Sequence, residues 1–300
     1  MSSSNNESII REMMAGLKGR PPSEDIITYI KNNDNMQCKI INTFNINNVF
    51  IREYDLKYNK IEFINNISSF YYKGRVGRRI DLLVYYKSPD ADILLGYIQL
   101  ASPILNVRLT EHIKTYMPKV DFSHINDKYV DMSICVGTGP LRDYLIGKLL
   151  VFIAMSREIV GIYNNKYNAH VTNLYTTSIY GKSSMYNRVR GLKYLGLTEG
   201  YHAVLTKEQI EEINTKYKEH FPNRRIKVSA LSQHTIRLYD HLKTAGVPLT
   251  FEIPKLKKGV YLCTELNNLE DNIQYWYNRW FIPRRDRLNA ENHNNCDKYK

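Results

Sequence analysis

The sequence predicts an α/β layered domain over residues 41–205. A polar, helical segment (1–40) precedes it, and a helical, basic extension (206–300) follows and packs on the core. Strand-like apolar runs alternate with helical patterns in the order β-β-β-α-β-α-β. Hydrophobic residues make up 43% of the 300-residue chain, enough for a substantial core. After residue 205 these runs give way to charged helical patterns.

The N-terminal segment is expected to hold two helices. One spans residues 8–17, and the other starts at Ser23, where Glu24 and Asp25 suit a first helical turn. Between them, the sequence KGRP at residues 18–21 resembles the core of a minor-groove AT-hook, although acidic residues follow it. The alternative is an ordinary loop.

Strands are expected wherever a short apolar run is bounded by turn residues. They span residues 79–86, 93–101, 130–136, 170–175 and 194–204. A helix is expected over residues 141–155, which are apolar nearly all round as in a helix buried between layers, and a short one over 183–190. The extension is expected to contain helices at 206–220 and 229–244, a strand at 260–264, and the aromatic, basic tail YWYNRWFIPRRDR.

The charge balance favours a polyanionic partner. The chain has 42 Lys and Arg residues against 30 Asp and Glu, a formal net charge of +12, which attracts nucleic acid. A soluble protein that is merely basic is the alternative. No apolar run approaches the roughly 20 residues needed to cross a bilayer, and the first residues lack a signal-peptide pattern. Four scattered cysteines form no CxxC pair. We therefore predict a cytoplasmic or other intracellular location and no membrane partner.

A glycine-containing turn follows the expected strand at residues 130–136. Glycines let the backbone approach a ligand, and free N–H groups at a helix start attract phosphate. The residues predicted to bind the phosphates of a cofactor are Gly137, Thr138, Gly139, Leu141 and Arg142. The spacing fits neither a dinucleotide fingerprint nor a P-loop, and a plain strand–helix turn is the alternative.

A second candidate site lies in the stretch YGKSSMYNRVRGLKYLG at residues 180–196. The phenol of Tyr186 and the hydroxyl of Ser184 could relay protons or position a leaving thiolate, and nearby arginines could hold phosphates. The alternative is a polar helix that packs its aromatic residue on the sheet. The sequence alone leaves both readings open.

Arginine pairs and two tryptophans suggest contacts with nucleic acid, since arginine binds phosphate bidentately and indoles stack on unpaired bases. The predicted contacts are Arg75, Arg78, Arg79, Arg188, Arg190, Lys193, Arg224, Arg225, Trp276, Trp280, Arg284 and Arg285. The alternatives are a solvated charged surface and, for the tryptophans, a spacing of four residues that docks a C-terminal helix on the core.

A two-strand metal nuclease is the enzyme class that the sequence argues against. Asp81 lies on one expected strand, but Gln99 and Ala101 stand on the next where a second acid and a lysine are needed. The histidines also lack a metal-binding spacing, so no metal is predicted.

Four segments, taken in order, resemble the DruA-like family, named for a subunit of the Druantia anti-phage systems. They read GRVGRRIDLLVYY, ILLGYIQLASPILNVRLTEHI, VGTGPLRDYLIGKLL and TNLYTTSIYGKSSMYNRVRGLKYLGLTEGYH. The matching positions of the last segment are Gly181, Ser184, Tyr186, Gly196, Thr198 and Gly200. This segment is also similar to the Mom DNA-modification proteins of bacteriophages and, more distantly, to the last motif of GNAT acetyltransferases.

The resemblance implies an acetyltransferase-like (GNAT-like) mixed sheet flanked by helices, and a Mom-like group transfer to a DNA base. Tyr186 and Ser184 would be catalytic, and acetyl-coenzyme A or a related acyl donor would be the cofactor. The acetyltransferase pyrophosphate loop, Gln/Arg-x-x-Gly-x-Gly/Ala, is absent from the sequence. The alternative is therefore a non-catalytic DNA-binding subunit of a defence or counter-defence complex. DNA is the expected partner in both cases, with other subunits of such a complex.

Overall fold

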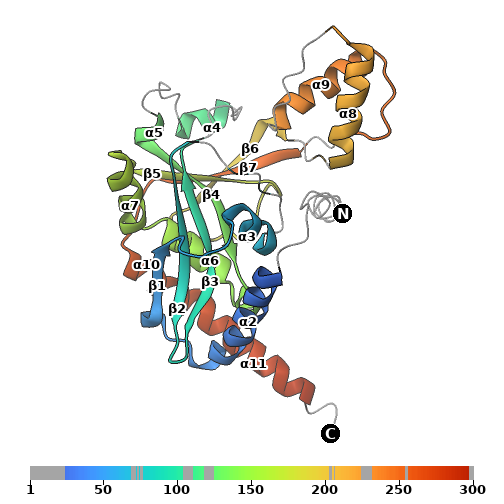
Figure 1. The fold of residues 1–300 in the computed structure, drawn as a ribbon. Coiled ribbons are helices and arrows are strands. Elements are labelled where there is room, and N and C mark those ends of the chain that lie inside the picture. The colour runs from blue at the N-terminus through green and yellow to red at the C-terminus, as the bar shows by residue number, and fades with distance from the viewer. Residues whose placement is uncertain are drawn as a thin grey trace.

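A seven-stranded mixed sheet with helices on both faces forms the centre of the computed structural model (Figure 1). The structure describes residues 24–68, 72, 74, 77–103, 111–117, 125–202, 205, 207–223, 232–253 and 256–296. The expected helix at residues 8–17 and the AT-hook-like run at 18–21 lie outside this range. The predicted α/β class is confirmed.

The strand order is β1-β2-β3-β4-β5-β7-β6. The strands are β1 (Val49–Glu53), β2 (Arg79–Lys87), β3 (Asp92–Ala101), β4 (Tyr129–Gly137), β5 (Asn173–Ser178), β6 (Lys193–His202) and β7 (Leu256–Cys263). β1 to β4 pair antiparallel in sequence order, β4 pairs with β5 in parallel, and β7 pairs antiparallel with both β5 and β6. β7 thus inserts part of the expected C-terminal extension into the sheet.

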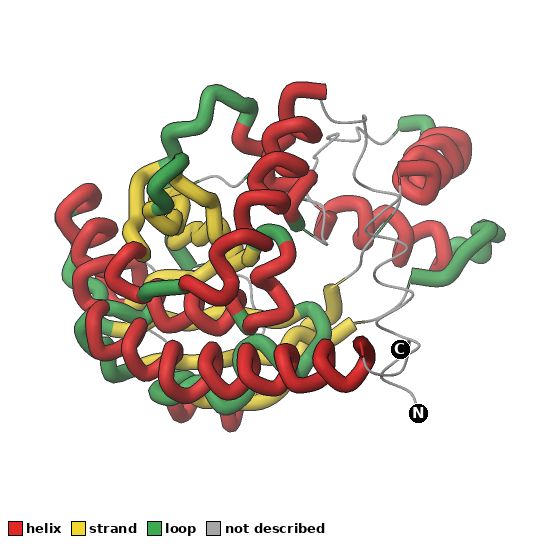
Figure 2. Tube along the Cα trace, turned by 90° about the horizontal axis from the view of Figure 1, so that it is seen from below, coloured by secondary structure: helices red, strands yellow, loops and turns green. Residues whose placement is uncertain are grey.

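Helices cover the sheet on either side, as the view from below shows (Figure 2). The α-helices are α2 (Glu24–Ile40), α3 (Lys60–Ile67), α4 (Glu111–Tyr116), α5 (Ile125–Lys128), α6 (Ile146–Ala154), α7 (Arg157–Tyr167), α8 (Lys207–His220), α9 (Ser232–Thr244), α10 (Leu269–Trp276) and α11 (Ile282–Cys296). Shorter 3₁₀ turns are η1 (Ile41–Thr43), η2 (Ile46–Asn48) and η3 (Pro140–Tyr144), and η4 (Tyr277–Phe281) is a π-helical turn.

Each face of the sheet has its own core. α6 is buried almost throughout and packs with α10 against one set of strand residues, including Leu82 and Ile98. Phe63 and Ile64 of α3 pack against the other face at Leu83. Because both faces of β2 and β3 are covered, these strands are continuous apolar runs rather than alternating ones.

The α8–α9 hairpin is inserted between β6 and β7 and stands away from the sheet (Figure 1). It has a hydrophobic cluster of its own, with Ile213, Tyr217 and Leu242 at its centre. No described helix has the length and apolarity to span a membrane.

The predicted strands at 79–86, 93–101, 130–136 and 194–204 are confirmed within a few residues, whereas the one expected at 170–175 begins at Asn173. The helix expected over residues 141–155 is divided. Leu145 has a left-handed backbone (φ 62°), so that α6 begins only at Ile146. The carbonyl of Leu145 accepts a hydrogen bond from the Trp276 indole, 3.1 Å away.

The short helix expected over residues 183–190 is wrong, because this stretch forms consecutive turns. Arg188 has a left-handed backbone (φ 59°), and the amide of Val189 bonds the carbonyl of Tyr186 three residues earlier. The ammonium of Lys148 donates to three carbonyls of the stretch, which therefore converge on one point instead of lying parallel as the carbonyls of an α-helix do.

Candidate nucleic-acid interface

The central strands β4 and β5 diverge. They pair only where Tyr129–Asp131 face Asn173–Tyr175, although both strands continue further. Just past the last pair, the hydroxyl of Thr176 donates to the carbonyl of Met132 across 2.8 Å. The turns at residues 183–188 fill the space beside this divergence, on the face of the sheet that α6 covers.

The phenol of Tyr186 faces the diverging strands. Its ring lies 5.0 Å from that of Tyr261 on β7, edge to face, and its hydroxyl bonds the side chain of Thr176. Burial raises the pKa of Tyr186, with a smaller contribution from nearby Cys135. The hydroxyl therefore stays protonated at neutral pH, as a proton donor must. The side chain of Ser184, in contrast, is exposed.

Lys148 of α6 holds the turns in place. Its ammonium donates to the carbonyls of Ser184 (2.8 Å), Met185 (3.1 Å) and Asn187 (2.7 Å). It also lies 4.6 Å from the centre of the Trp280 ring. Burial lowers the pKa of Lys148 to about 8, and the neighbouring charge of Arg188 adds to the effect. Lys148 thereby fixes the backbone from which Arg188 projects.

Three arginines gather at the aromatic residues beside these turns, and we call Arg188, Arg190 and Arg279 the arginine cluster. Arg188 and Arg279 lie 5.6 and 4.9 Å from the centre of the Trp280 ring, and Arg190 lies 4.1 Å from that of Tyr275. Among the described residues, no carboxylate forms an ion pair with any of the three. Their charges are thus available to an anionic ligand.

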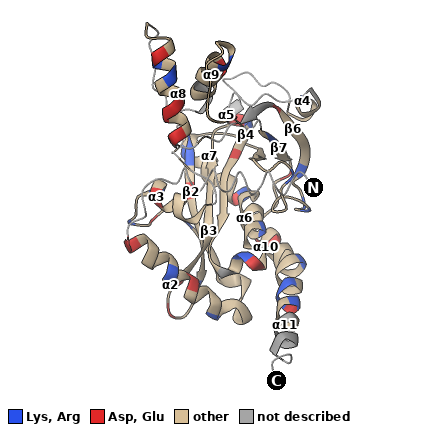
Figure 3. Ribbon diagram, turned by 90° about the vertical axis from the view of Figure 1, so that its right-hand side faces the viewer, with Lys and Arg blue, Asp and Glu red and all other residues tan. Residues whose placement is uncertain are grey.

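A cavity of about 490 Å³ opens at the arginine cluster. Its lining residues come from the 190 turn, α10 and η4: Arg190, Asp271, Gln274, Tyr275, Asn278 and Arg279. Figure 3 shows further basic residues around α10 and along α11. Sequence reasoning missed Arg279, although its position next to Trp280 in the aromatic tail is a signal that could have identified it.

The two tryptophans lie inside the protein. Trp276 is fully buried and Trp280 is 8% exposed, so neither presents a face to an unpaired base. Trp276 contacts Phe44 and Phe281, which joins α10 to the core. This arrangement corresponds to the alternative in which the four-residue spacing docks a C-terminal helix.

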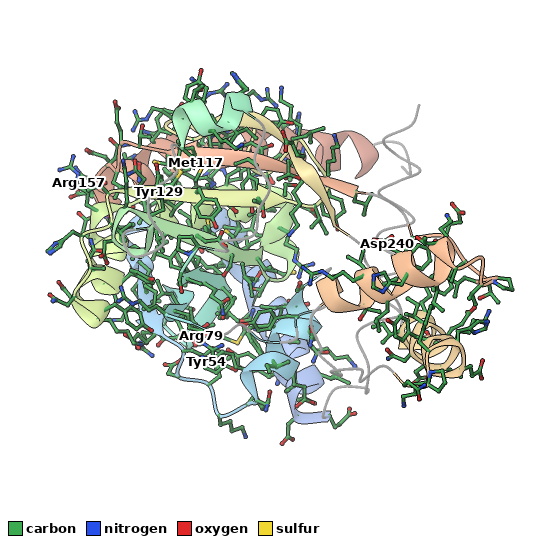
Figure 4. The ribbon with its side chains drawn as sticks, turned by 90° about the horizontal axis from the view of Figure 1, so that it is seen from above. Tyr54, Arg79, Met117, Tyr129, Arg157 and Asp240 are labelled. Carbon is green, nitrogen blue, oxygen red and sulfur yellow. The ribbon has the colours of Figure 1, made fainter. Side chains whose placement is uncertain are left out.

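The other predicted basic residues do not join the arginine cluster. Arg78 pairs with Asp127 (3.5 Å), Arg79 lies 3.7 Å from Asp81 and is labelled in Figure 4, and Lys193 lies over the Tyr116 ring. On α11, Arg284 donates to the carbonyl of Asp143 and Arg285 pairs with Asp286. Arg75, Arg224 and Arg225 lie outside the described residues.

The loop at residues 137–142, predicted to bind cofactor phosphates, is bonded to a side chain of α2. Gln37 donates to the hydroxyl of Thr138 (3.1 Å) and accepts from the amide of Leu141 (3.4 Å). Arg142 turns back to the carbonyl of Gly137 (2.7 Å). The amide expected to hold a phosphate is therefore already used. No local pattern predicts Gln37, which lies 104 residues from Leu141 along the chain.

Asp81 is at the centre of a polar network on the opposite face of the sheet. It faces Gln99 on β3 and accepts hydrogen bonds from the amide of Gln99 (2.7 Å), the hydroxyl of Tyr97 (2.5 Å) and the ammonium of Lys60. Burial alone would raise the pKa of Asp81, but these hydrogen bonds outweigh it and lower the pKa. Within the described part of the chain, no three His, Cys, Asp or Glu side chains gather as a metal site.

We expect Asp81→Asn to lower the free energy of unfolding by about 3 kcal/mol at pH 7. The substitution removes the buried negative charge that pairs with the ammonium of Lys60 and accepts the hydrogen bonds of the network. The lowered pKa means that Asp81 stabilises the fold above its unfolded pKa, near 3.8, and stops doing so as the pH falls through the folded value. Urea unfolding should therefore show the difference from wild type shrinking below pH 4.

Asp92→Asn is the matched control, because Asp92 pairs with Arg52 at the surface of the same sheet, where such pairs contribute about 0–1 kcal/mol. Equal losses for the two variants would contradict a central role for Asp81.

Comparisons with known proteins give one family. The family model described as "Druantia protein DruA" matches residues 20–270. The chain is also similar to a curated protein, "Druantia protein DruA" of Escherichia coli (strain UMEA 4076-1), with 24% identity over 252 residues. The aligned part covers 69% of this chain and 61% of that protein. No solved structure matches the chain.

Proposed function

Because the chain belongs to the DruA family, we propose that it is a DNA-binding subunit of an anti-phage defence assembly, with other subunits of that assembly as partners. The observation that carries the DNA-binding part is the arginine cluster. Three guanidinium groups without carboxylate partners among the described residues lie over two neighbouring aromatic rings, and two of them, those of Arg190 and Arg279, line one cavity. Guanidinium groups of this kind bind phosphate oxygens, and the net charge of +12 attracts DNA to them.

We further propose that the scaffold is acetyltransferase-like. In such a fold two central strands diverge where donor and acceptor meet, and the early divergence of parallel β4 and β5 supports this assignment. The strand order, with β7 between β5 and β6, also agrees with it.

Two features favour binding over catalysis. The space beside the diverging strands is filled by the turns that Lys148 anchors. The amide of Leu141, which would face a donor phosphate, is bonded to Gln37. A donor could enter only after both had moved.

We expect Arg190→Ala and Arg279→Ala each to weaken DNA binding about tenfold at low salt, because each removes one charged hydrogen-bond donor. Each should also lower the slope of log affinity against log salt by about one, since one phosphate contact fewer releases fewer counterions. Fluorescence anisotropy with labelled DNA over a salt series measures both quantities.

Arg237→Ala is the matched control, because Arg237 is an exposed arginine on α9 outside the arginine cluster. A cluster variant that binds like this control at every salt concentration would contradict the proposal.

Mom-like group transfer to a DNA base is the second candidate function. One observation favours it: the Tyr186 hydroxyl lies next to the diverging strands, where such a fold brings donor and acceptor together. The donor would be acetyl-coenzyme A or a related acyl compound. Mass spectrometry of nucleosides from cells that express the protein is the test, and unmodified nucleosides leave the binding function as the conclusion.

A further inference from the structure

A second cavity, of about 300 Å³, lies between α2, α3 and the loop at residues 137–142. Its apolar wall includes Ile30, Ile67 and Leu94, and the ring of Tyr29 completes it. The cavity also has polar lining residues, of which two are already hydrogen-bonded to the carbonyl of Leu94: the polar residues are Asn33, Asp34, Asn66, Thr138 and Arg142, and the two bonded ones are Asn33 and Thr138. Two of these groups carry opposite charges: Asp34 and Arg142.

Asp34 is the unexplained group of this cavity. Its Oδ1 atom is buried and has no hydrogen-bond partner among the described residues. It lies against the loop so closely that a Cβ on Gly139 would be 2.5 Å away. A buried carboxylate oxygen without a hydrogen-bond partner destabilises a fold. We therefore expect this cavity to bind a ligand that donates a hydrogen bond to the oxygen.

The charges narrow the ligand class. The Asp34 carboxylate repels a phosphate, and Arg142 repels a cation. The guanidinium of Arg142 binds the carbonyls of Gly137 and Ile67 through Nε and Nη2, so Nη1 can donate to a ligand. A flat, uncharged ligand with an N–H edge for Asp34 and an acceptor edge for Arg142 therefore fits best.

We propose that this cavity binds an unpaired nucleobase. A base offers a ring face to the apolar wall, N–H groups to the carboxylate and ring acceptors to the guanidinium. Guanine matches most fully, since it has adjacent N–H donors on one edge and the O6 and N7 acceptors that arginine prefers on another. The choice of a base over other planar amides rests on the proposed DNA-binding function.

The test uses the full chain and four nucleosides in equilibrium dialysis, with guanosine expected to bind most tightly. Asp34→Asn keeps the shape of the side chain but replaces an acceptor by a donor. We expect it to weaken binding by about tenfold or more. Asp240→Asn is the control, because Asp240 is exposed on α9, away from the sheet (Figure 4).

A second arm distinguishes a free nucleoside from a base within a strand. Single-stranded DNA with one guanine is compared with the same strand carrying an abasic site there. If single strands bind and free nucleosides do not, the ligand is a base within a strand. Asp34→Asn should then weaken the binding of the guanine strand and leave the binding of the abasic strand unchanged.

Binding that is unchanged by Asp34→Asn in both arms, in a variant with wild-type thermal stability, overturns the nucleobase proposal. The DNA-binding function has a separate readout, because Arg190→Ala should weaken the guanine strand and the abasic strand equally.

Discussion

Replacement of Trp276 by alanine is expected to lower the free energy of unfolding by about 3–5 kcal/mol. The side chain is fully buried, and its ring lies 5.3 Å from Phe281 and 6.0 Å from Phe44. The substitution removes the largest buried side chain of α10 and its hydrogen bond to Leu145. It leaves a cavity at the junction between α10 and α6, which relaxation closes only in part.

Urea unfolding measures this loss, with Leu197→Ala as the control at an exposed apolar position, where changes stay within about 0.5 kcal/mol. Affinity for single-stranded DNA, expressed per folded molecule, should be unchanged in Trp276→Ala. A variant with wild-type stability and lost single-strand affinity would instead assign Trp276 to base stacking.

The second large effect is expected for Tyr186→Phe if the protein transfers a group to DNA. Loss of a proton donor costs about 10²–10⁴-fold in rate, while DNA affinity stays nearly intact. The substitution removes only the hydroxyl that bonds Thr176, and the ring remains beside Tyr261. The rate of appearance of modified nucleosides, measured by mass spectrometry on DNA incubated with the protein, gives the ratio.

Ser183→Ala is a control in the same turns, because its hydroxyl accepts a hydrogen bond from the amide of Met185, two residues along the chain. A folded Tyr186→Phe protein that modifies DNA at the wild-type rate would remove Tyr186 from the mechanism.

The strands were predicted correctly where both faces of the sheet are buried. β2 and β3 are continuous apolar runs because helices cover them on either side, so composition alone marks them. β1 was not predicted, since it has three half-buried and two exposed residues and carries little of this signal. The prediction of a helix over residues 183–190 was wrong, because this stretch forms turns whose carbonyls converge on the buried ammonium of Lys148.

The candidate sites, like the strands and helices, were predicted only in part. The net charge and the positions of Arg188 and Arg190 are properties of the sequence, and from them we predict a polyanionic partner. These two arginines lie beside Arg279 and not beside the arginines of α11, because η4 packs against the turns.

The α/β class, the family, the basic charge and the glycine loop at residues 137–142 can all be recognised in the amino-acid sequence. Three features became visible only in the folded chain: Gln37 is bonded to this loop, the Oδ1 atom of Asp34 lies beside it without a hydrogen-bond partner among the described residues, and both tryptophans are buried. Composition and periodicity reflect only whether each segment faces solvent or core. The partner of a polar side chain more than a hundred residues away depends on how the helices pack.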